Sequence, residues 1–409
     1  MPGLAHSTAL RADPRPATLR TLLALAVVFV LLATTGWTAV HRPEGGTPLR
    51  ATALAAWAKA RLDGRPVPPA DAPVRTVARF FAALDGADRA RLAEGYPLVV
   101  GNLDGVPVAT RYEANLHGLE QAARVEDARS RDVALTPADR ALATRRAHRF
   151  ASLADPGRQI LAFDPTGGGL VAEVFGDLER ARRVSVIVPG VDTDALTFER
   201  SQRRLTSPVG MAESLYAAER AAAPDSRTAV IAWAGYTAPT GVGMDAATGR
   251  LAFDGAVRLK SLTVSLPGDA EVALFCHSYG SVVCGVAARE LPDRVTDVVV
   301  AGSPGMRASN VEGLHTTARV WATRDEGDWI ADVPHLEVGG LGHGADPVSP
   351  DFGARLLSSE RARSHTGYFA PGTDSVENFA KIGTGTFASI VCATGDDACR
   401  REIPGAEQD

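Results

Sequence analysis

The sequence predicts an α/β fold in which helices cover both faces of a mostly parallel β-sheet. A helical N-terminal region and one transmembrane helix are expected before it. From Gln159 onward, short apolar runs and helical patterns follow one another in the order βββαβαβαββ. These runs lack the polar alternation of a strand with one wet face, as expected for strands buried on both faces. The transmembrane helix is predicted from an uncharged stretch near the N-terminus.

The composition indicates a globular protein and excludes several other classes. Of the 409 residues, 45% are hydrophobic and 22% are charged, which rules out a disordered, collagen-like or disulfide-scaffold chain. A formal net charge of -5 gives no broad electrostatic reason to bind nucleic acid. The mean hydropathy of -0.02 excludes a polytopic membrane protein.

The uncharged stretch covers residues Leu22–Val40 (LLALAVVFVLLATTGWTAV). At 1.5 Å per residue, a helix of this length spans about 28 Å, close to the thickness of a bilayer core. Three arginines and one aspartate lie upstream, so the positive-inside rule places residues 1–20 in the cytoplasm and the rest of the chain outside. We expect a membrane anchor; a cleaved signal peptide and a buried helix are the alternatives.

The remaining chain divides by composition. A stretch rich in Pro, Gly and Ala follows the anchor and is interpreted as a partly ordered spacer with one helix over Thr52–Leu62. Then comes a helical region in which Thr136 and Pro137 supply an N-cap and a first-turn proline. The predicted organisation is a cytoplasmic N-terminus (1–20), a transmembrane anchor (21–41), a linker (42–73), a helical region (74–155), the sheet domain (156–390) and a tail (391–409).

Four cysteines are too few to staple a fold of this size. Cys392 and Cys399 lie close together in a Gly/Asp-rich segment, a spacing that suits a local disulfide in an oxidising compartment. Unpaired thiols are the alternative. No histidine follows at metal-ligand spacing, so we expect no metal site at these cysteines.

The segment EVALFCHSYGSVVCGVAARE predicts a nucleophile on a sharp turn. A strand ends at Cys276, Ser278 falls in the turn and a helix begins near Tyr279, which is the setting of the G-x-S-x-G nucleophile elbow. A serine hydroxyl needs a nearby base, and a helix N-terminus stabilises the developing oxyanion. Cys276 stands where the motif has its first glycine. The alternative is a serine that only caps a helix.

In such sites the acid follows the serine in the chain and the base follows the acid. The expected strand ARVWATR leads into DEGDWIADV, which offers Asp325, Asp328 and Asp332. We predict Asp328 as the acid, because it follows a turn glycine from which it can point back across the strand ends. Asp325 is the main alternative.

The base is expected among the histidines late in the chain. His365 follows a long loop and precedes a helix, and we predict that it is the base. His343 lies in a Gly-rich loop and is the rival. His335 falls in an expected strand, and His315 precedes the acid in the chain.

The oxyanion hole is expected to combine the backbone N–H of Tyr279 with that of Val191. Val191 lies in the segment VSVIVPGVDTD, where Gly190 lets the backbone approach closely. A plain Pro-Gly turn is the alternative. Asp192 and Asp194 in this loop are interpreted as solvated or capping carboxylates rather than metal ligands.

These segments together resemble an actinobacterial α/β-hydrolase family long known only as a domain of unknown function. The elbow CHSYGS and the segment PLVVGNLDGVP are the most distinctive, alongside VSVIVPGVDTD, ATRDEGDWI, LGHGADPVSPDFGA and SHTGYF. The family elbow usually reads GHSYGS and its acid loop GDPI, so Cys276 and Trp329 are departures.

The resemblance implies an α/β-hydrolase fold with Ser278, Asp328 and His365 as a catalytic triad. It also implies that the helical segment Phe80–Asn115 belongs to the hydrolase unit. It implies no substrate, because one fold supports many activities.

The sequence therefore predicts a membrane-anchored, extracytoplasmic serine hydrolase that acts on a small-molecule or lipid-like ester and needs no cofactor. The alternative is a non-catalytic cell-envelope protein that retains the fold as a scaffold, supported only by Cys276 in the elbow. A dinucleotide site is not expected, because the segment PTGGGL (Pro165–Leu170) has no helix after it.

Overall fold

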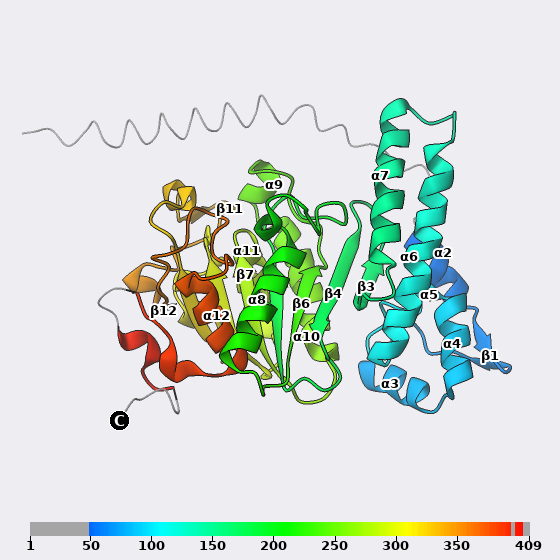
Figure 1. Cartoon of the computed structure of the whole chain (residues 1–409), viewed down its shortest axis with the longest axis horizontal. Helices are drawn as coiled ribbons and strands as arrows, with labels where there is room; N and C mark the ends of the chain where they lie inside the picture. The colour runs from blue at the N-terminus through cyan, green and yellow to red at the C-terminus, as the bar shows by residue number, and fades with distance from the viewer. Residues whose placement is uncertain (1–48, 394–396, 404–409) are drawn as a thin grey trace, which may run out of the picture. The chain divides into compact units, whose positions relative to one another are not determined.

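The computed structural model describes residues 49–393 and 397–403 (Figure 1). The stretch Leu22–Val40 lies outside these residues, so its assignment as a membrane anchor stays a prediction. Within the described part of the chain, no helix is both long and apolar enough to cross a bilayer.

The central element is an eight-stranded sheet with the strand order β12-β9-β8-β7-β5-β6-β4-β3. All neighbours from β12 to β6 pair in parallel, and β4 pairs antiparallel with both of its neighbours, β6 and β3. The prediction of a mostly parallel sheet is confirmed. The strands are β3 (Ile160–Asp164), β4 (Leu170–Gly176), β5 (Arg183–Val188), β6 (Thr228–Ala234), β7 (Glu271–His277), β8 (Val295–Ala301), β9 (Arg319–Thr323) and β12 (Arg355–Leu356).

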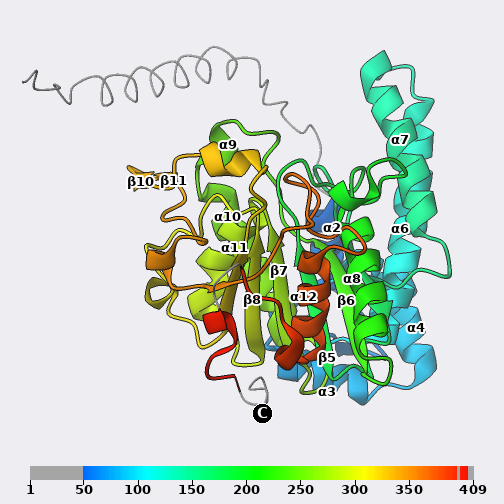
Figure 2. The same ribbon diagram turned by 60° about the vertical axis from the view of Figure 1, so that its left-hand side comes forward.

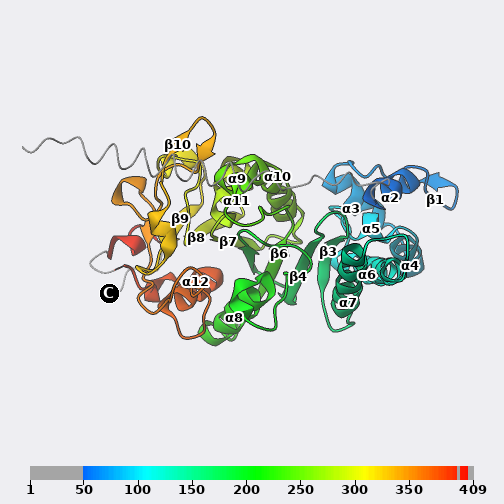
Figure 3. The ribbon, with the colours of Figure 1, turned by 90° about the horizontal axis from the view of Figure 1, so that it is seen from above.

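Helices cover both faces of this sheet, as Figure 3 shows from above. On one face lie α8 (Pro208–Ala222) and α12 (Asp374–Thr384), and on the other α10 (Arg250–Ser265) and α11 (Gly280–Ala287). The core around the sheet is accordingly split into two apolar clusters, one on each face. Strand β6 is buried throughout and contributes alternate residues to each cluster, which explains why its sequence shows no polar alternation.

The helical region packs at the β3 end of the sheet (Figures 1 and 3). Two asparagine amides connect them: Asn102 Nδ2 donates to Phe163 O at 2.7 Å, and Asn115 Nδ2 donates to Ile160 O at 3.0 Å. This contact covers an edge strand that would otherwise expose its backbone groups. The helices are α3 (Val74–Ala82), α4 (Gly86–Gly95), α5 (Pro97–Val100), α6 (Val108–Ser130) and α7 (Pro137–Leu153).

The stretch expected as a linker over 42–73 is ordered from Leu49 onward, and its first helix overlaps the helix expected over Thr52–Leu62. Helix α2 (Leu49–Trp57) is followed by a short hairpin of β1 (Arg61–Leu62) and β2 (Arg65–Pro66). Trp57 is 1% exposed, and its indole N–H donates to Pro68 O at 2.7 Å. The Pro-, Gly- and Ala-rich composition is typical of a spacer, but Trp57, Leu62 and Val67 are buried in one apolar cluster with residues of the helical region.

The expected tail over 391–409 is also folded in part. Cys392 forms a bridge with Leu357 beside β12 and a disulfide with Cys399. Arg355 donates to the backbone carbonyl of Cys399 at 2.9 Å, and Ile403 is 3% exposed. Of the two alternatives left open for Cys392 and Cys399, the structure has the disulfide.

Short elements lie above the carboxyl ends of the parallel strands. Helix α9 (Met244–Ala247) and the hairpin of β10 (Glu337–Val338) and β11 (Leu341–Gly342) are seen there in Figure 2. An isolated bridge between Thr248 and Leu341 connects the two. This edge of the sheet carries the candidate site.

Candidate active site

The candidate site is built from loops that follow four adjacent strands. In the sheet, β5, β7, β8 and β9 are neighbours and parallel, so the residues after their carboxyl ends meet at one edge. Gly190 follows β5, Ser278 follows β7, Gly302 follows β8 and Asp328 follows β9. His365 comes from the long loop between β12 and α12.

Ser278 occupies a strained turn between β7 and α11. Its φ of 54° lies in the left-handed region that non-glycine residues rarely adopt. Its N–H donates to Ala301 O at 3.0 Å, and its carbonyl accepts from Ser281 N at 2.9 Å. A Cβ on Gly190 would lie 2.7 Å from Ser278 Cβ, so only glycine allows the β5 loop this close.

Ser278, His365 and Asp328 form one chain of hydrogen bonds. Ser278 Oγ lies 2.8 Å from His365 Nε2, and His365 Nδ1 lies 2.9 and 3.0 Å from the two oxygens of Asp328. A carboxylate only accepts, so the imidazole proton is on Nδ1 and the Nε2 lone pair faces the serine hydroxyl. Serine hydrolases use a hydrogen-bonded chain of this kind to activate a nucleophile.

Asp328 lies in a polar pocket with three donors. Besides His365, the Tyr368 hydroxyl donates to Oδ2 at 2.5 Å and Ile330 N–H donates to Oδ1 at 2.9 Å. Burial alone would raise the pKa of Asp328, but these hydrogen bonds outweigh it and the pKa lies below its ordinary value. The carboxyl is therefore ionised at neutral pH and can stabilise an imidazolium.

Sequence reasoning missed two side chains that support the triad. Tyr368 bonds to Asp328 and also accepts from Asp325 N–H at 3.0 Å. His277 Nε2 lies 2.6 Å from the backbone carbonyl of His365. Burial lowers the pKa of His277 to about 4, so the ring is neutral and donates from Nε2. His277 lies in the segment CHSYGS and Tyr368 in SHTGYF, so both are part of the motifs that pointed to the site.

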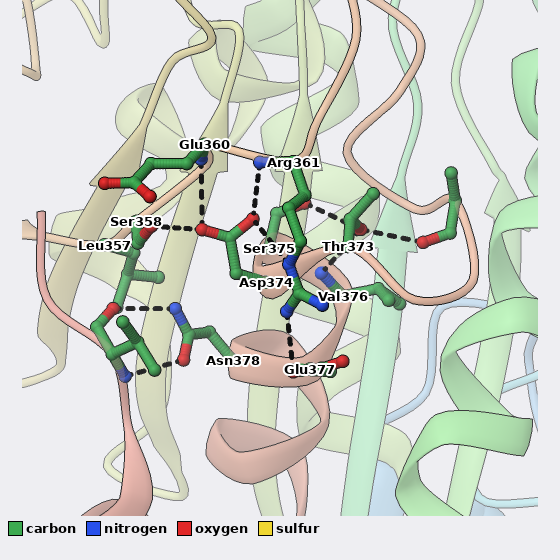
Figure 4. A network of polar contacts seen from close by, with 12 residues as sticks. Leu357, Ser358, Glu360, Arg361, Thr373, Asp374, Ser375, Val376, Glu377 and Asn378 are labelled. Carbon is green, nitrogen blue, oxygen red and sulfur yellow. Dashed lines mark hydrogen bonds and ion pairs between the residues drawn. The ribbon is translucent and has the colours of Figure 1, made fainter.

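The loop that carries His365 is anchored at both ends. Figure 4 shows Asp374, at the start of α12, accepting from the Ser358 hydroxyl and from the backbone N–H groups of Glu360 and Arg361. Ser375 donates to the carbonyl of Tyr368 at 2.7 Å. These contacts fix a segment of irregular structure and so hold the imidazole of His365 in place.

Trp329 covers the outer side of the histidine. Its ring lies 4.8 Å from the His365 ring, and its side chain is 47% exposed. By contrast, Ser278 is only 6% exposed. The position at which the resembled family has proline therefore presents an apolar wall beside the triad.

The two predicted oxyanion donors are placed by different elements. Tyr279 is the N-cap of α11, and Val191 follows Gly190 in the β5 loop. Among the described residues, neither backbone N–H donates a hydrogen bond. The loop is braced by Asp192, whose N–H donates to Pro239 O at 2.8 Å and whose side chain accepts from Gly241 N–H at 2.7 Å.

The rival residues lie outside the hydrogen-bonded triad. Asp325 accepts from Ser364 N–H at 2.9 Å, and Asp332 is exposed. His343 is buried and bonds through Nε2 to Ala246 O at 2.7 Å. His335 precedes β10 rather than lying in a strand, with its Nε2 3.4 Å from a backbone carbonyl. His315 is exposed.

Cys276 forms a disulfide with Cys284, a pairing that sequence analysis did not predict. The bond joins the end of β7 to α11 and so spans the elbow that holds Ser278. Cys276 was the one feature in favour of a scaffold without activity, and here it leaves the geometry of the turn intact. No cluster of three or more potential metal ligands is found among the described residues.

Comparison with known proteins agrees with the topology. A family model described as alpha/beta hydrolase matches residues 164–338. The fold is that of the α/β-hydrolases. The match includes Ser278 and Asp328 and ends before His365.

Two curated relatives are uncharacterized proteins of Mycobacterium tuberculosis strains CDC 1551 and H37Rv. Each is 28% identical over 401 residues, covering 84% of this chain and 60% of the relative. This chain thus spans less than two thirds of the length of these relatives.

Three of the solved structures that are similar to this chain are described as follows. A CIB-like hydrolase from Thermoplasma acidophilum has a TM-score of 0.34 and 14% identity, covering 56% of this chain and 96% of that one. Dienelactone hydrolase from Anabaena variabilis has a TM-score of 0.33 and 19% identity, covering 55% of this chain and 93% of that one. Est1E from Butyrivibrio proteoclasticus has a TM-score of 0.33 and 12% identity, covering 56% of this chain and 99% of that one. No statement about substrate follows from them.

Proposed function

We propose that this protein is a serine hydrolase that cleaves esters through an acyl intermediate on Ser278. The observation that carries the proposal is the continuous chain from Ser278 Oγ through His365 to Asp328, at a strained turn before a helix. A serine that only capped a helix would not require this base and carboxylate.

In the proposed mechanism, Ser278 Oγ attacks the ester carbonyl while His365 Nε2 takes its proton. The N–H groups of Tyr279 and Val191 hold the oxyanion, and His365 then returns the proton to the leaving alcohol. Water activated by the same histidine hydrolyses the acyl-enzyme. Asp328 stabilises the imidazolium and stays ionised throughout.

A lipid-like or otherwise apolar ester is the proposed substrate. Several large apolar side chains are exposed around the carboxyl edge of the sheet. Exposed apolar side chains gathered in one region are typical of a surface that binds an apolar ligand. Trp329 contacts the catalytic histidine directly. The others lie in the segments of α9 and the β10–β11 hairpin, namely Val242, Met244, Leu336, Val338 and Leu341.

The test is hydrolysis of p-nitrophenyl acetate, butyrate and octanoate by the full chain. We expect the longer esters to give the higher kcat/KM, and Ser278→Ala to lower kcat by about 10⁴ or more. Ser281→Ala is the matched control, because this serine lies in the first turn of α11, just after Ser278, and its hydroxyl donates to the carbonyl of Cys276. Retention of wild-type turnover by Ser278→Ala would overturn the proposal.

We also propose that the protein is anchored in the cell membrane with its hydrolase unit outside. Support comes from the apolar stretch Leu22–Val40 and from two disulfides, which persist in oxidising compartments. The full chain should stay in membranes washed with alkaline carbonate, and deletion of residues 1–41 should release it. Recovery of the full chain in the wash would contradict the anchor.

A further inference from the structure

A second cavity lies away from the triad, between the helical region and the β3–β4 end of the sheet. Its volume is about 470 Å³, within the usual range of small-ligand sites. Part of its wall is the segment PLVVGNLDGVP, which the proposed mechanism does not use. We propose that this cavity binds a small monocarboxylate, and that Arg111 is the residue that holds the carboxylate.

Arg111 is a buried charge with few partners. The residue is 6% exposed and lies on α6 facing the cavity. Its Nε donates to Gly101 O at 3.3 Å, and the nearest acid oxygen, on Asp104, lies 4.0 Å from Nη1. The other oxygen of Asp104 already accepts from the Ser261 hydroxyl. Within the described chain, neither Nη group of Arg111 makes a hydrogen bond.

Other arginines in the same structure show how a charge close to the core is normally compensated. Arg319 donates to both oxygens of Asp297 at 2.7 and 2.6 Å. Arg158 donates twice to Glu173. Arg111 has no such fork-to-carboxylate pairing, and burial lowers its pKa. Burying a guanidinium is unfavourable unless it is paired, so the unpaired Nη groups of Arg111 are expected to bind a ligand.

The rest of the wall defines the chemistry of that ligand. A guanidinium fork matches a carboxylate with two parallel hydrogen bonds. Arg50 and Arg258 also line the cavity, but so do Asp71 and Asp164 besides Asp104, and Arg50 lies 3.6 Å from Asp164. With Arg111 included, three arginines and three aspartates line the cavity, so the wall has no excess positive charge. A single negative charge therefore fits better than a phosphate dianion.

Apolar side chains complete the cavity and provide room for the body of the ligand. They come from the sheet, from α10 and from the segment before α3, with Ala162, Ala172, Trp233 and Leu262 among them. The site therefore suits a short-chain carboxylate. No triad residue is among those lining it, so the inference does not rest on the proposed hydrolase activity.

Isothermal titration of the full chain, purified in detergent, with butyrate tests the proposal. We expect one butyrate per chain, binding at least tenfold weaker to Arg111→Met, and at least tenfold weaker binding of the uncharged isostere butanamide to wild type. Arg124→Met is the matched control, because Arg124 is an exposed arginine of the same helix whose side chain pairs with Glu120. Ser278→Ala should bind butyrate as wild type does, which separates this cavity from the triad.

Two further variants cover the case in which Arg111→Met does not fold. Arg111→Lys keeps the charge without the fork and should bind about tenfold more weakly. Ala162→Phe should fill the cavity and abolish binding while leaving Arg111 in place. Equal butyrate affinity in wild type and these variants, tighter binding of inorganic phosphate than of butyrate, or no binding to wild type would each overturn the proposal.

Discussion

The carboxylate of Asp328 shows how much of the site depends on individual side chains. His365, Tyr368 and the backbone of Ile330 all donate to it, and its own side chain is fully buried. A Cβ on Gly302, which has a φ of +56°, would lie 2.8 Å from Asp328 Oδ2. Glycine after β8 is therefore needed for the acid to reach the histidine.

Exchange of this acid for an amide tests its role. Asp328→Asn should lower kcat for ester hydrolysis by about 10³ to 10⁴, because the amide no longer holds the proton of His365 on Nδ1. Asp325→Asn is the control, since Asp325 accepts a backbone N–H from the base loop and its amide can do the same. We expect less than a tenfold effect there. A larger loss at Asp325 than at Asp328 would reverse the assignment of the acid.

Residues of the candidate triad could be predicted because each lies in a local motif whose topology is known. Ser278 sits between a strand and a helix, and Asp328 and His365 follow in the expected order. The contacts that support the triad could not be predicted from the sequence, because His277 bonds to the backbone carbonyl of His365, in a loop far along the chain. Tyr368 likewise reaches Asp328 only after that loop folds back.

At the scale of elements, the elbow is held by a covalent bond between strand and helix. Cys276 lies at the end of β7 and Cys284 lies in α11, with their Cα atoms 6.5 Å apart. From the sequence alone Cys276 is only a substituted glycine of the elbow, because its pairing with Cys284 depends on how the helix packs back against the strand. The closed loop contains Ser278 itself.

Removal of each disulfide should separate stability from activity. Cys276→Ala/Cys284→Ala and Cys392→Ala/Cys399→Ala open loops of similar length, so each should lose about 2–3 kcal/mol of unfolding free energy. Only the first pair spans Ser278, the proposed nucleophile. It should lower kcat about tenfold with little change in KM, whereas the second should keep wild-type turnover. Denaturant titration and ester kinetics measure the two effects, and equal loss of activity in both would refute a positioning role for the first bond.

For the whole molecule, α8 joins the sheet to α12 through a buried acid. Glu219 on α8 accepts from the Ser185 hydroxyl of β5, and the Thr228 hydroxyl of β6 lies beside it. A Cβ on Gly383 of α12 would lie 2.2 Å from Glu219 Oε1. Burial raises the pKa of Glu219 to about 8 from an ordinary value of 4.5, so the folded protein holds it as a neutral carboxyl at pH 7.

This raised pKa predicts how stability depends on pH. The stabilisation from neutral Glu219 is fully present below pH 4.5, where the unfolded chain is also protonated, and is lost as pH rises toward 8. The slope is at most about 1.4 kcal/mol per pH unit. Glu219→Gln should remove this slope in denaturant titrations between pH 5 and 9. Glu213→Gln, on the same helix, should retain it. An unchanged slope in Glu219→Gln would show that Glu219 is ionised when folded.

The architecture of the whole molecule could be predicted from its apolar runs, but its boundaries could not. A parallel sheet buried on both faces leaves a clear pattern in the sequence. The N-terminal segment from Leu49 packs through Trp57, and the C-terminal one through Cys399 and Ile403. In both cases a few large or cross-linked residues hold a segment whose average composition resembles a linker.

The central claim is that Ser278 is an activated nucleophile, and labelling with a fluorophosphonate tests it most directly. The folded full chain should react at one residue, identified as Ser278 by peptide mass spectrometry, and Ser278→Ala should not react. His365→Gln should react far more slowly, because the hydroxyl then has no base at 2.8 Å. A folded wild-type chain that does not react, or a label that persists in Ser278→Ala, would contradict the account.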